Sequence, residues 1–205
     1  MNIRRIASLV GSFVLLVAMC FPSCAPVVKP VAATLPSTKP VAERPPIFDI
    51  PLIDSIKVDD DPSAWGMSLS DASLFAGDLA GSRSYAEKAR EALERQLRDA
   101  PDDPQRHVIL GLALARLGRK EDAIREGRRG VELMPMSRDA PQAAYAQHQL
   151  ARIYISVGEP EKALDQLEPL LKIPYYLTPA WLKIDPNFDP LRSNPRFQKL
   201  VAGAK

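Results

Sequence analysis

The amino-acid sequence predicts an all-α protein, a short solenoid of about three helical hairpins with capping helices at its C-terminal end. Two observations lead to this prediction. Between residues 68 and 174, apolar residues recur every three or four positions, which places them on one face of each helix. Along the same stretch, small residues and prolines return at a regular spacing, which is typical of stacked helical repeats.

The clearest unit covers residues 103–135. Its first helix is expected to begin after Asp103, an N-cap residue, with Pro104 at the first helical position, where the missing N–H costs nothing. Gly118 follows the last apolar residue and favours the left-handed conformation that ends many helices. A second helix is predicted from about residue 120 to residue 134. The buried face of the first helix is predicted to contain Leu110, Ala113, Leu114 and Leu117.

This unit resembles a tetratricopeptide repeat (TPR), a helical hairpin with a period of about 34 residues. The resemblance rests on a leucine-glycine pair, a packing leucine, a turn glycine, an alanine of the second helix and a terminal proline. In this sequence they are Leu110-Gly111, Leu114, Gly118, Ala123 and Pro135. Small residues at Gly111 and Ala123 are expected to let the two helices approach closely.

Two further copies can be aligned on this middle copy, which covers residues 104–137. Ala89 and Pro101 lie 34 positions before the corresponding alanine and proline, which defines a first copy over residues 70–103. In the other direction the spacing is 40, one period plus an insertion, and the third copy covers residues 144–177. Its matching residues are Leu150-Ala151, Tyr154, Gly158, Ala163 and Leu167.

Interior glycines distinguish the first two copies. The alignment places Gly77 and Gly81 in the first helix of the first copy, and a capping box at Ser84 and Glu87 is predicted to begin its second helix. Two more glycines fall inside the second helix of the middle copy, Gly127 and Gly130. Because each interior glycine costs about 1 kcal/mol relative to alanine, these helices are expected to depend on stacking against their neighbours.

The C-terminal residues 175–205 are predicted to form a capping segment. Three N-cap residues followed by proline predict short helices near 179–184, 190–193 and 195–202. The apolar residues available to cover the last repeat are Trp181, Phe188, Leu191, Phe197 and Leu200. Residues 104–202 resemble the C-terminal TPR regions of bacterial multidomain signalling proteins that carry a kinase or adenylate cyclase module. The chain has no glycine-rich phosphate loop and no HRD or DFG motif, so the kinase itself is not implied.

Residues 1–21 read as an export signal, because two arginines precede a short apolar run. Cys20 or Cys24 could accept a lipid as in bacterial lipoproteins, and an ordinary signal-peptidase cut is the alternative. Residues 22–67 are rich in proline and are predicted to be a disordered linker, with the helical body starting near Ser68. The acidic run 59–61 is interpreted as a solvated turn rather than a calcium loop. We therefore expect an exported protein, periplasmic or anchored to the membrane of the bacterial envelope.

The composition limits the classes of partner and site that are expected. The formal net charge is +2, and apart from Arg4 and Arg5 the basic and acidic residues balance, which argues against nucleic acid as the main partner. No cysteine follows Cys24, so a disulfide framework or cysteine metal site is not expected in the helical body. With two histidines, no HExxH and no GxSxG motif, we expect no catalytic residues, metal or cofactor.

The TPR resemblance implies a groove lined by the first helix of each repeat. Carried onto this chain, the groove positions are Gln105, Val108, Leu112, Ala115, Arg116, Tyr145, His148, Arg152, Ile155 and Ser156. Arg116, Tyr145, His148 and Arg152 would form a mildly cationic patch suited to a peptide carboxylate or an acidic segment. The alternative is that Arg152 pairs with a neighbouring glutamate and binds nothing.

The sequence thus favours an exported TPR adaptor or scaffold that binds a protein or peptide partner in the envelope. One alternative is a small-ligand sensor or enzyme accessory that uses His148 and Arg152. Another is a structural module that self-associates through its first repeat.

Overall fold

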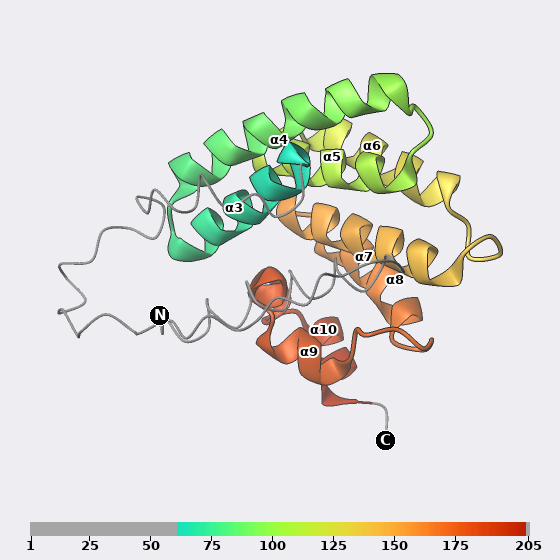
Figure 1. The fold of residues 1–205 in the computed structure, drawn as a ribbon. Helices are drawn as coiled ribbons and strands as arrows, with labels where there is room; N and C mark the ends of the chain where they lie inside the picture. Colours follow the sequence, from blue (N-terminus) through green and yellow to red (C-terminus); the bar gives the residue numbers. More distant parts are fainter. Residues whose placement is uncertain (1–60, 204–205) are drawn as a thin grey trace, which may run out of the picture. The chain divides into compact units, whose positions relative to one another are not determined.

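The computed structural model describes residues 61–203, and every regular element in that range is helical (Figure 1). The all-α prediction is therefore confirmed for these residues. The elements are α3 (Pro62–Ala76), α4 (Leu79–Asp99), α5 (Pro104–Arg116), α6 (Lys120–Leu133), α7 (Ala140–Ser156), α8 (Pro160–Leu170), α9 (Pro179–Ile184), the 3-10 helix η3 (Pro186–Leu191) and α10 (Pro195–Ala202).

The six long helices of residues 61–203 form three hairpins. Helix α3 packs against α4, α5 against α6, and α7 against α8, and a short turn joins the two helices of each pair. Each turn contains a glycine with positive φ, Gly77 at 85°, Gly118 at 80° and Gly158 at 76°, a conformation that a side chain disfavours. Successive hairpins also pack on one another, since α5 contacts α4 and α7 contacts both α5 and α6.

The first hairpin differs from the other two in the position of its turn. Helix α4 has 21 residues against 14 in α6, so the turn lies about two helical turns earlier than the repeat spacing predicts. The placement of Gly77 and Gly81 inside one helix was wrong, because Gly77 ends α3 and Gly81 lies in the first turn of α4. Helix α4 begins after Asp78, whose carboxylate accepts a hydrogen bond from the Gly81 N–H at 2.8 Å, and not at the predicted box of Ser84 and Glu87.

The start of the helical body was also predicted too late. Helix α3 begins at Pro62 rather than near Ser68, so the predicted linker does not include residues 62–67. The local cause is an N-cap, since the Asp61 carboxylate accepts a hydrogen bond from the Ser63 N–H at 2.9 Å and proline occupies the first helical position. Asp61 therefore caps a helix.

The predicted export signal, the lipidation candidates Cys20 and Cys24, and the linker up to residue 60 lie outside the described residues. The predictions made for them remain predictions.

The predicted repeat positions inside the helices are buried. Ala123, Ala151 and Ala163 are fully buried, Gly111 is buried as well, and Pro135 is exposed just after α6. A Cβ on Gly111 would lie 2.9 Å from the carbonyl oxygen of Ala123, closer than Cβ atoms approach such an oxygen. Close contact between α5 and α6 therefore requires a glycine here.

The glycines inside α6 also allow neighbouring helices to approach closely. At Gly130 a Cβ would lie 2.5 Å from Cγ1 of Val108 and 2.6 Å from the carbonyl oxygen of Pro104. At Gly127 its nearest neighbour would be the terminal methyl of Ile153, at 2.6 Å. Gly130 thus faces α5 and has backbone atoms of α5 among its neighbours. Gly127 instead faces a side chain of α7.

We expect Gly130→Ala to destabilise the protein, although alanine is the better helix former by about 1 kcal/mol. The added methyl must displace the backbone of α5, so the free energy of unfolding should fall by about 1–3 kcal/mol in urea denaturation followed by circular dichroism. Gly127→Ala is the matched variant, and its loss should be smaller because the terminal methyl of Ile153 can turn away. A stabilised Gly130→Ala protein would contradict this packing.

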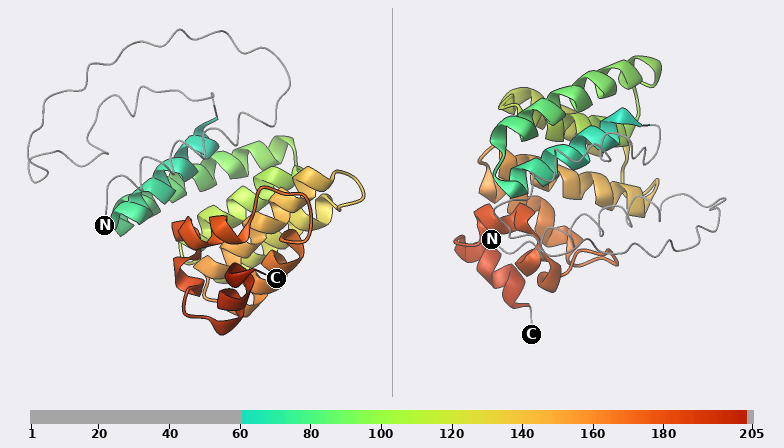
Figure 2. Two further views of the ribbon diagram at one scale, coloured as in Figure 1. Left: turned by 90° about the horizontal axis from the view of Figure 1, so that it is seen from below. Right: turned by 60° about the vertical axis from the view of Figure 1, so that its left-hand side comes forward.

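The C-terminal segment folds into three short helices against α7 and α8 (Figure 2). The predicted helices at 179–184 and 195–202 are confirmed as α9 and α10. The prediction at 190–193 was wrong in position, because the 3-10 helix η3 begins at Pro186. Asp185 caps it by accepting a hydrogen bond from the Asn187 N–H at 2.9 Å, so the first of two Asp-Pro pairs starts the turn.

This segment covers the third hairpin as predicted. Its buried leucines and phenylalanines are 0–3% exposed and join the leucines of α7 and α8 in one apolar cluster, and Trp181 and Leu200 pack against it partly buried. The buried members from the segment are Leu177, Leu182, Phe188, Leu191 and Phe197. At the edge of the cluster, Arg196 of α10 pairs with Glu168 at 2.6 Å and with Asp165 at 2.8 Å, both on α8.

Candidate functional site

The predicted groove residues fall into separate environments. Val108 is fully buried and faces Gly130 of α6, inside its own hairpin. Leu112 is 5% exposed and belongs to the apolar core. Their prediction as groove-lining residues is therefore wrong. Gln105 is exposed on the first turn of α5, and Tyr145 is half-buried on α7.

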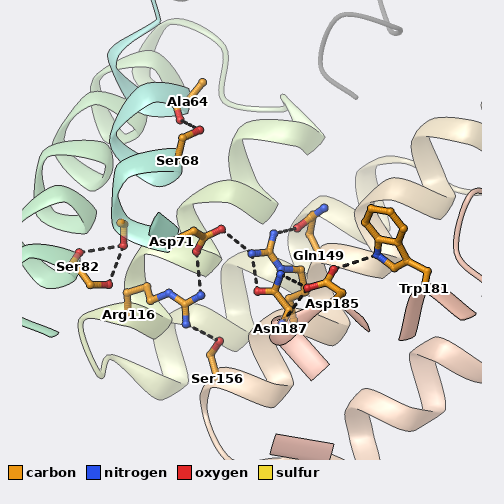
Figure 3. Close-up of polar contacts among 12 residues, drawn as sticks. Ala64, Ser68, Asp71, Ser82, Arg116, Gln149, Ser156, Trp181, Asp185 and Asn187 are labelled. Carbon is orange, nitrogen blue, oxygen red and sulfur yellow. Dashed lines mark hydrogen bonds and ion pairs between the residues drawn. The ribbon is translucent and has the colours of Figure 1, made fainter. Parts of the chain in front are cut away.

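Arg116 and Arg152 do come together, and a carboxylate from the first hairpin joins them. Nη2 of Arg116 donates to one oxygen of Asp71 at 2.9 Å, and Nη2 of Arg152 donates to the other at 2.7 Å (Figure 3). The three side chains come from α5, α7 and α3, so the contact ties all three hairpins together. Arg152 is 4% exposed, and the side chains of Arg116 and Asp71 are 12% and 13% exposed.

The contact continues from Arg152 into the C-terminal segment. Nη2 of Arg152 also donates to Oδ1 of Asn187 at 2.9 Å, and Nδ2 of Asn187 donates to Oδ1 of Asp185 at 2.8 Å. The other oxygen of Asp185 accepts a hydrogen bond from the indole N–H of Trp181 at 3.0 Å. We call Arg116, Asp71, Arg152, Asn187 and Asp185 the polar row. Its charged members alternate in sign, from a cation at one end to a carboxylate at the other.

Ionisation in the polar row follows from this pairing. Burial alone would raise the pKa of Asp71, but the charges of Arg152 and Arg116 outweigh it and hold that pKa below its ordinary value. Burial would likewise lower the pKa of Arg152, and the charge of Asp71 outweighs it and raises the pKa. Both groups are thus charged at neutral pH. The alternative in which Arg152 pairs within the protein describes this structure, with Asp71 in place of the expected glutamate.

His148 lies beneath the C-terminal segment and does not face an open groove. It is 4% exposed, its Nδ1 shares a hydrogen bond with the hydroxyl of Tyr176 at 2.7 Å, and its ring stacks on Phe188 with centroids 6.0 Å apart. Burial, reinforced by the positive charge of Arg152, lowers the pKa of His148 to about 3. The imidazole is therefore neutral at physiological pH, and its prediction as part of a cationic patch was wrong.

The polar row opens to the surface at Arg116. Here the last turns of α3, α5 and α7 meet the first turns of α4 around a cleft of about 190 Å³. Its lining residues are Leu74, Leu79, Ser82, Arg83, Ala115, Arg116 and Ser156. Nη1 of Arg116 donates to the hydroxyl of Ser156 across the cleft at 3.3 Å. We call this the three-hairpin cleft, because every hairpin contributes to it.

Sequence reasoning found only part of this cleft. The groove alignment named Ala115, Arg116 and Ser156, which lie on the well-aligned middle and third hairpins. It missed Arg83, because groove positions were assigned only to the middle and third copies and the turn of the first hairpin was predicted too late in the sequence. A helix start at Asp78 could have been recognised from the Gly77-Asp78 pair, which combines a helix stop with an N-cap residue.

A larger hollow of about 490 Å³ lies on the outer side of α6 and is strongly charged. Its arginines have partners of their own. Arg125 pairs with Asp122 at 2.6 Å, Arg129 pairs with Asp102 at 2.8 Å, and Nε of Arg128 donates to the hydroxyl of Tyr154 at 3.0 Å. Among the described residues, this face is a network of surface ion pairs without a free cluster of cations.

In residues 61–203, the histidine, cysteine and acidic side chains form no group of three with a geometry suited to a metal ion. None of the helices in this range combines the length and apolar character that crossing a bilayer requires. A scan of the chain against protein-family models matched none, and searches of curated proteins and of solved structures found no match either.

Proposed function

We propose that this chain is an exported TPR-type adaptor that binds a protein partner in the bacterial envelope. The three-hairpin cleft is the observation that carries the proposal. Its walls come from α3 and α4, from α5 and from α7, so it exists only when the hairpins are stacked. A recess formed between stacked repeats is the kind of surface on which helical solenoids bind their partners.

The helical hairpins support the TPR part of this proposal. Each ends its first helix with a glycine of positive φ, and the middle and third hairpins bury an alanine, Ala123 or Ala163, early in the second helix. The proposal places the binding surface at the end of α5 that carries Arg116. His148 and Arg152 support it from within, because a ligand could reach them only by breaking their contacts with Tyr176, Asp71 and Asn187.

The location is proposed from the sequence. The basic and apolar start would direct the chain out of the cytoplasm, and the proline-rich stretch would act as a tether. Cys20 or Cys24 would provide a lipid anchor. Mass spectrometry of the protein recovered from bacterial membranes tests this step, since a chain that keeps Met1 would contradict signal cleavage.

Partner binding is tested by affinity capture from detergent-solubilised membranes. We expect wild-type protein to capture one identified envelope protein, and a Leu79→Ser, Arg83→Glu double variant to retain about a fifth of it or less, because both changes fall on the cleft wall. Arg95→Glu is the matched control, an exposed arginine of α4 outside the cleft, and should capture normally. Equal capture by all three proteins would place the binding surface elsewhere and contradict the proposal.

A further inference from the structure

We infer that the three-hairpin cleft binds a carboxylate of the partner, presented by an extended peptide segment with an apolar side chain beside it. This inference rests on the proposed function and adds the chemistry of the bound segment. It follows from the donors, the charge and the apolar wall of the cleft.

Arg116 supplies directed donors. A guanidinium has five N–H groups, and the hydrogen bonds of Arg116 within the described residues, to Asp71 and Ser156, engage two of them. The hydroxyl of Ser156 accepts one of these bonds, so its own hydrogen remains available to a ligand. An acceptor in the cleft that contacts both Arg116 and Ser156 would thus receive a hydrogen bond from each, as a carboxylate oxygen can.

The charges around the cleft favour a ligand with a single negative charge. In the polar row, Arg116 and Arg152 are matched by Asp71 and Asp185, so the row as a whole is neutral. Arg83 is exposed at the cleft and forms no ion pair with any described residue. No carboxylate is among the described residues that line the cleft. Among residues 61–203, one uncompensated cation therefore faces the ligand, which fits a monoanionic carboxylate better than a doubly charged phosphate.

An apolar wall stands next to these donors. Leu79, the first residue of α4, is 62% exposed, and the cleft is also lined by Leu74 and Ala115. An exposed leucine beside a partly buried guanidinium suits a segment in which an apolar side chain neighbours the carboxylate. A volume of about 190 Å³ accommodates one or two side chains, so the rest of the segment would lie outside the cleft.

The ligand chemistry is tested with fluorescein-labelled hexapeptides and the full chain in detergent, read out by fluorescence anisotropy. The first peptide is Gly-Ser-Leu-Glu-Leu-Ser with an amidated end, and the second carries glutamine in place of glutamate. The third is the glutamine peptide with a free C-terminal carboxylate. We expect the first or the third to bind about tenfold more tightly than the second. The one that does so shows whether the carboxylate belongs to a side chain or to a chain end.

The position of the site is tested with single variants of Leu79, Arg83 and Arg95. Arg83→Glu should weaken the tighter peptide about tenfold, because it replaces an attraction by a repulsion, while Arg95→Glu makes the same change in net charge and should bind as wild type. Leu79→Ser should weaken it as well. Equal binding of all three peptides, or equal losses in the Arg83 and Arg95 variants, would overturn the inference. Either result can coexist with normal capture of an envelope partner, so it leaves the proposed function standing.

Discussion

Asp71→Ala is expected to lower the free energy of unfolding by about 3–5 kcal/mol, the largest loss for any single charge in residues 61–203. The carboxylate is the shared partner of Arg116 and Arg152, and Arg152 is 4% exposed. Without it, Arg152 would keep its charge in a buried position and lose the ion pair that offsets desolvation. Urea denaturation followed by circular dichroism measures the change.

The control for this prediction is an aspartate in a surface ion pair. Asp102→Ala removes the partner of Arg129, but these side chains are 73% and 47% exposed, so we expect a loss below about 1 kcal/mol. Losses of similar size for Asp71→Ala and Asp102→Ala would show that the polar row does not hold the hairpins together.

The pH dependence of stability provides a second measurement on the same residue. The folded protein holds the pKa of Asp71 below its ordinary value of 3.8. The stabilisation by its charge is therefore complete above that pH and is lost as the pH falls through the folded-state pKa. The difference in unfolding free energy between wild type and Asp71→Asn should narrow in acid, and a difference independent of pH would contradict an ionised Asp71.

Much of the fold could be predicted because its signals are local. An N-cap residue followed by proline defines the start of α5, and a glycine after the last apolar residue marks its end. Both signals act within one helical turn, so the sequence carries them without tertiary information. The first hairpin was predicted less well because the repeat spacing was given more weight than the local signals at Gly77 and Asp78.

The site could be predicted only in part because its contacts are distant in the sequence. Arg152 and Asp71 are 81 positions apart, and no local pattern distinguishes a groove arginine from one whose carboxylate comes from another hairpin. Val108 shows a related difficulty, since the repeat alignment placed it in the groove, whereas it is buried against Gly130 of its own hairpin. The position of a residue within a repeat therefore predicted its place on a helix better than it predicted the residues that it contacts.

Phe188→Ala is expected to lower the free energy of unfolding by about 3–5 kcal/mol, because the side chain is fully buried and its removal leaves a cavity. Its ring stacks on His148 and on Phe197, with centroids 6.0 and 6.4 Å apart. The cavity would thus open between α7 and the C-terminal segment, which cannot close it without moving Asn187 away from Arg152. Thermal and urea denaturation measure the loss.

Ile184→Ala serves as the control, since Ile184 belongs to the same segment but is 68% exposed, and its loss of unfolding free energy should stay within about 0.5 kcal/mol.

The shape of the unfolding transition of Phe188→Ala shows whether the C-terminal segment unfolds together with the hairpins. Because the polar row joins it to α3 and α5, we expect Phe188→Ala to unfold in one cooperative step at lower urea, with helix signal and tryptophan fluorescence changing together. Trp181 reports on the segment and Trp65 on α3. An early fluorescence change with intact helices would show that the C-terminal segment unfolds alone. The polar row would then hold α7 to α3 without making the C-terminal segment unfold together with the hairpins.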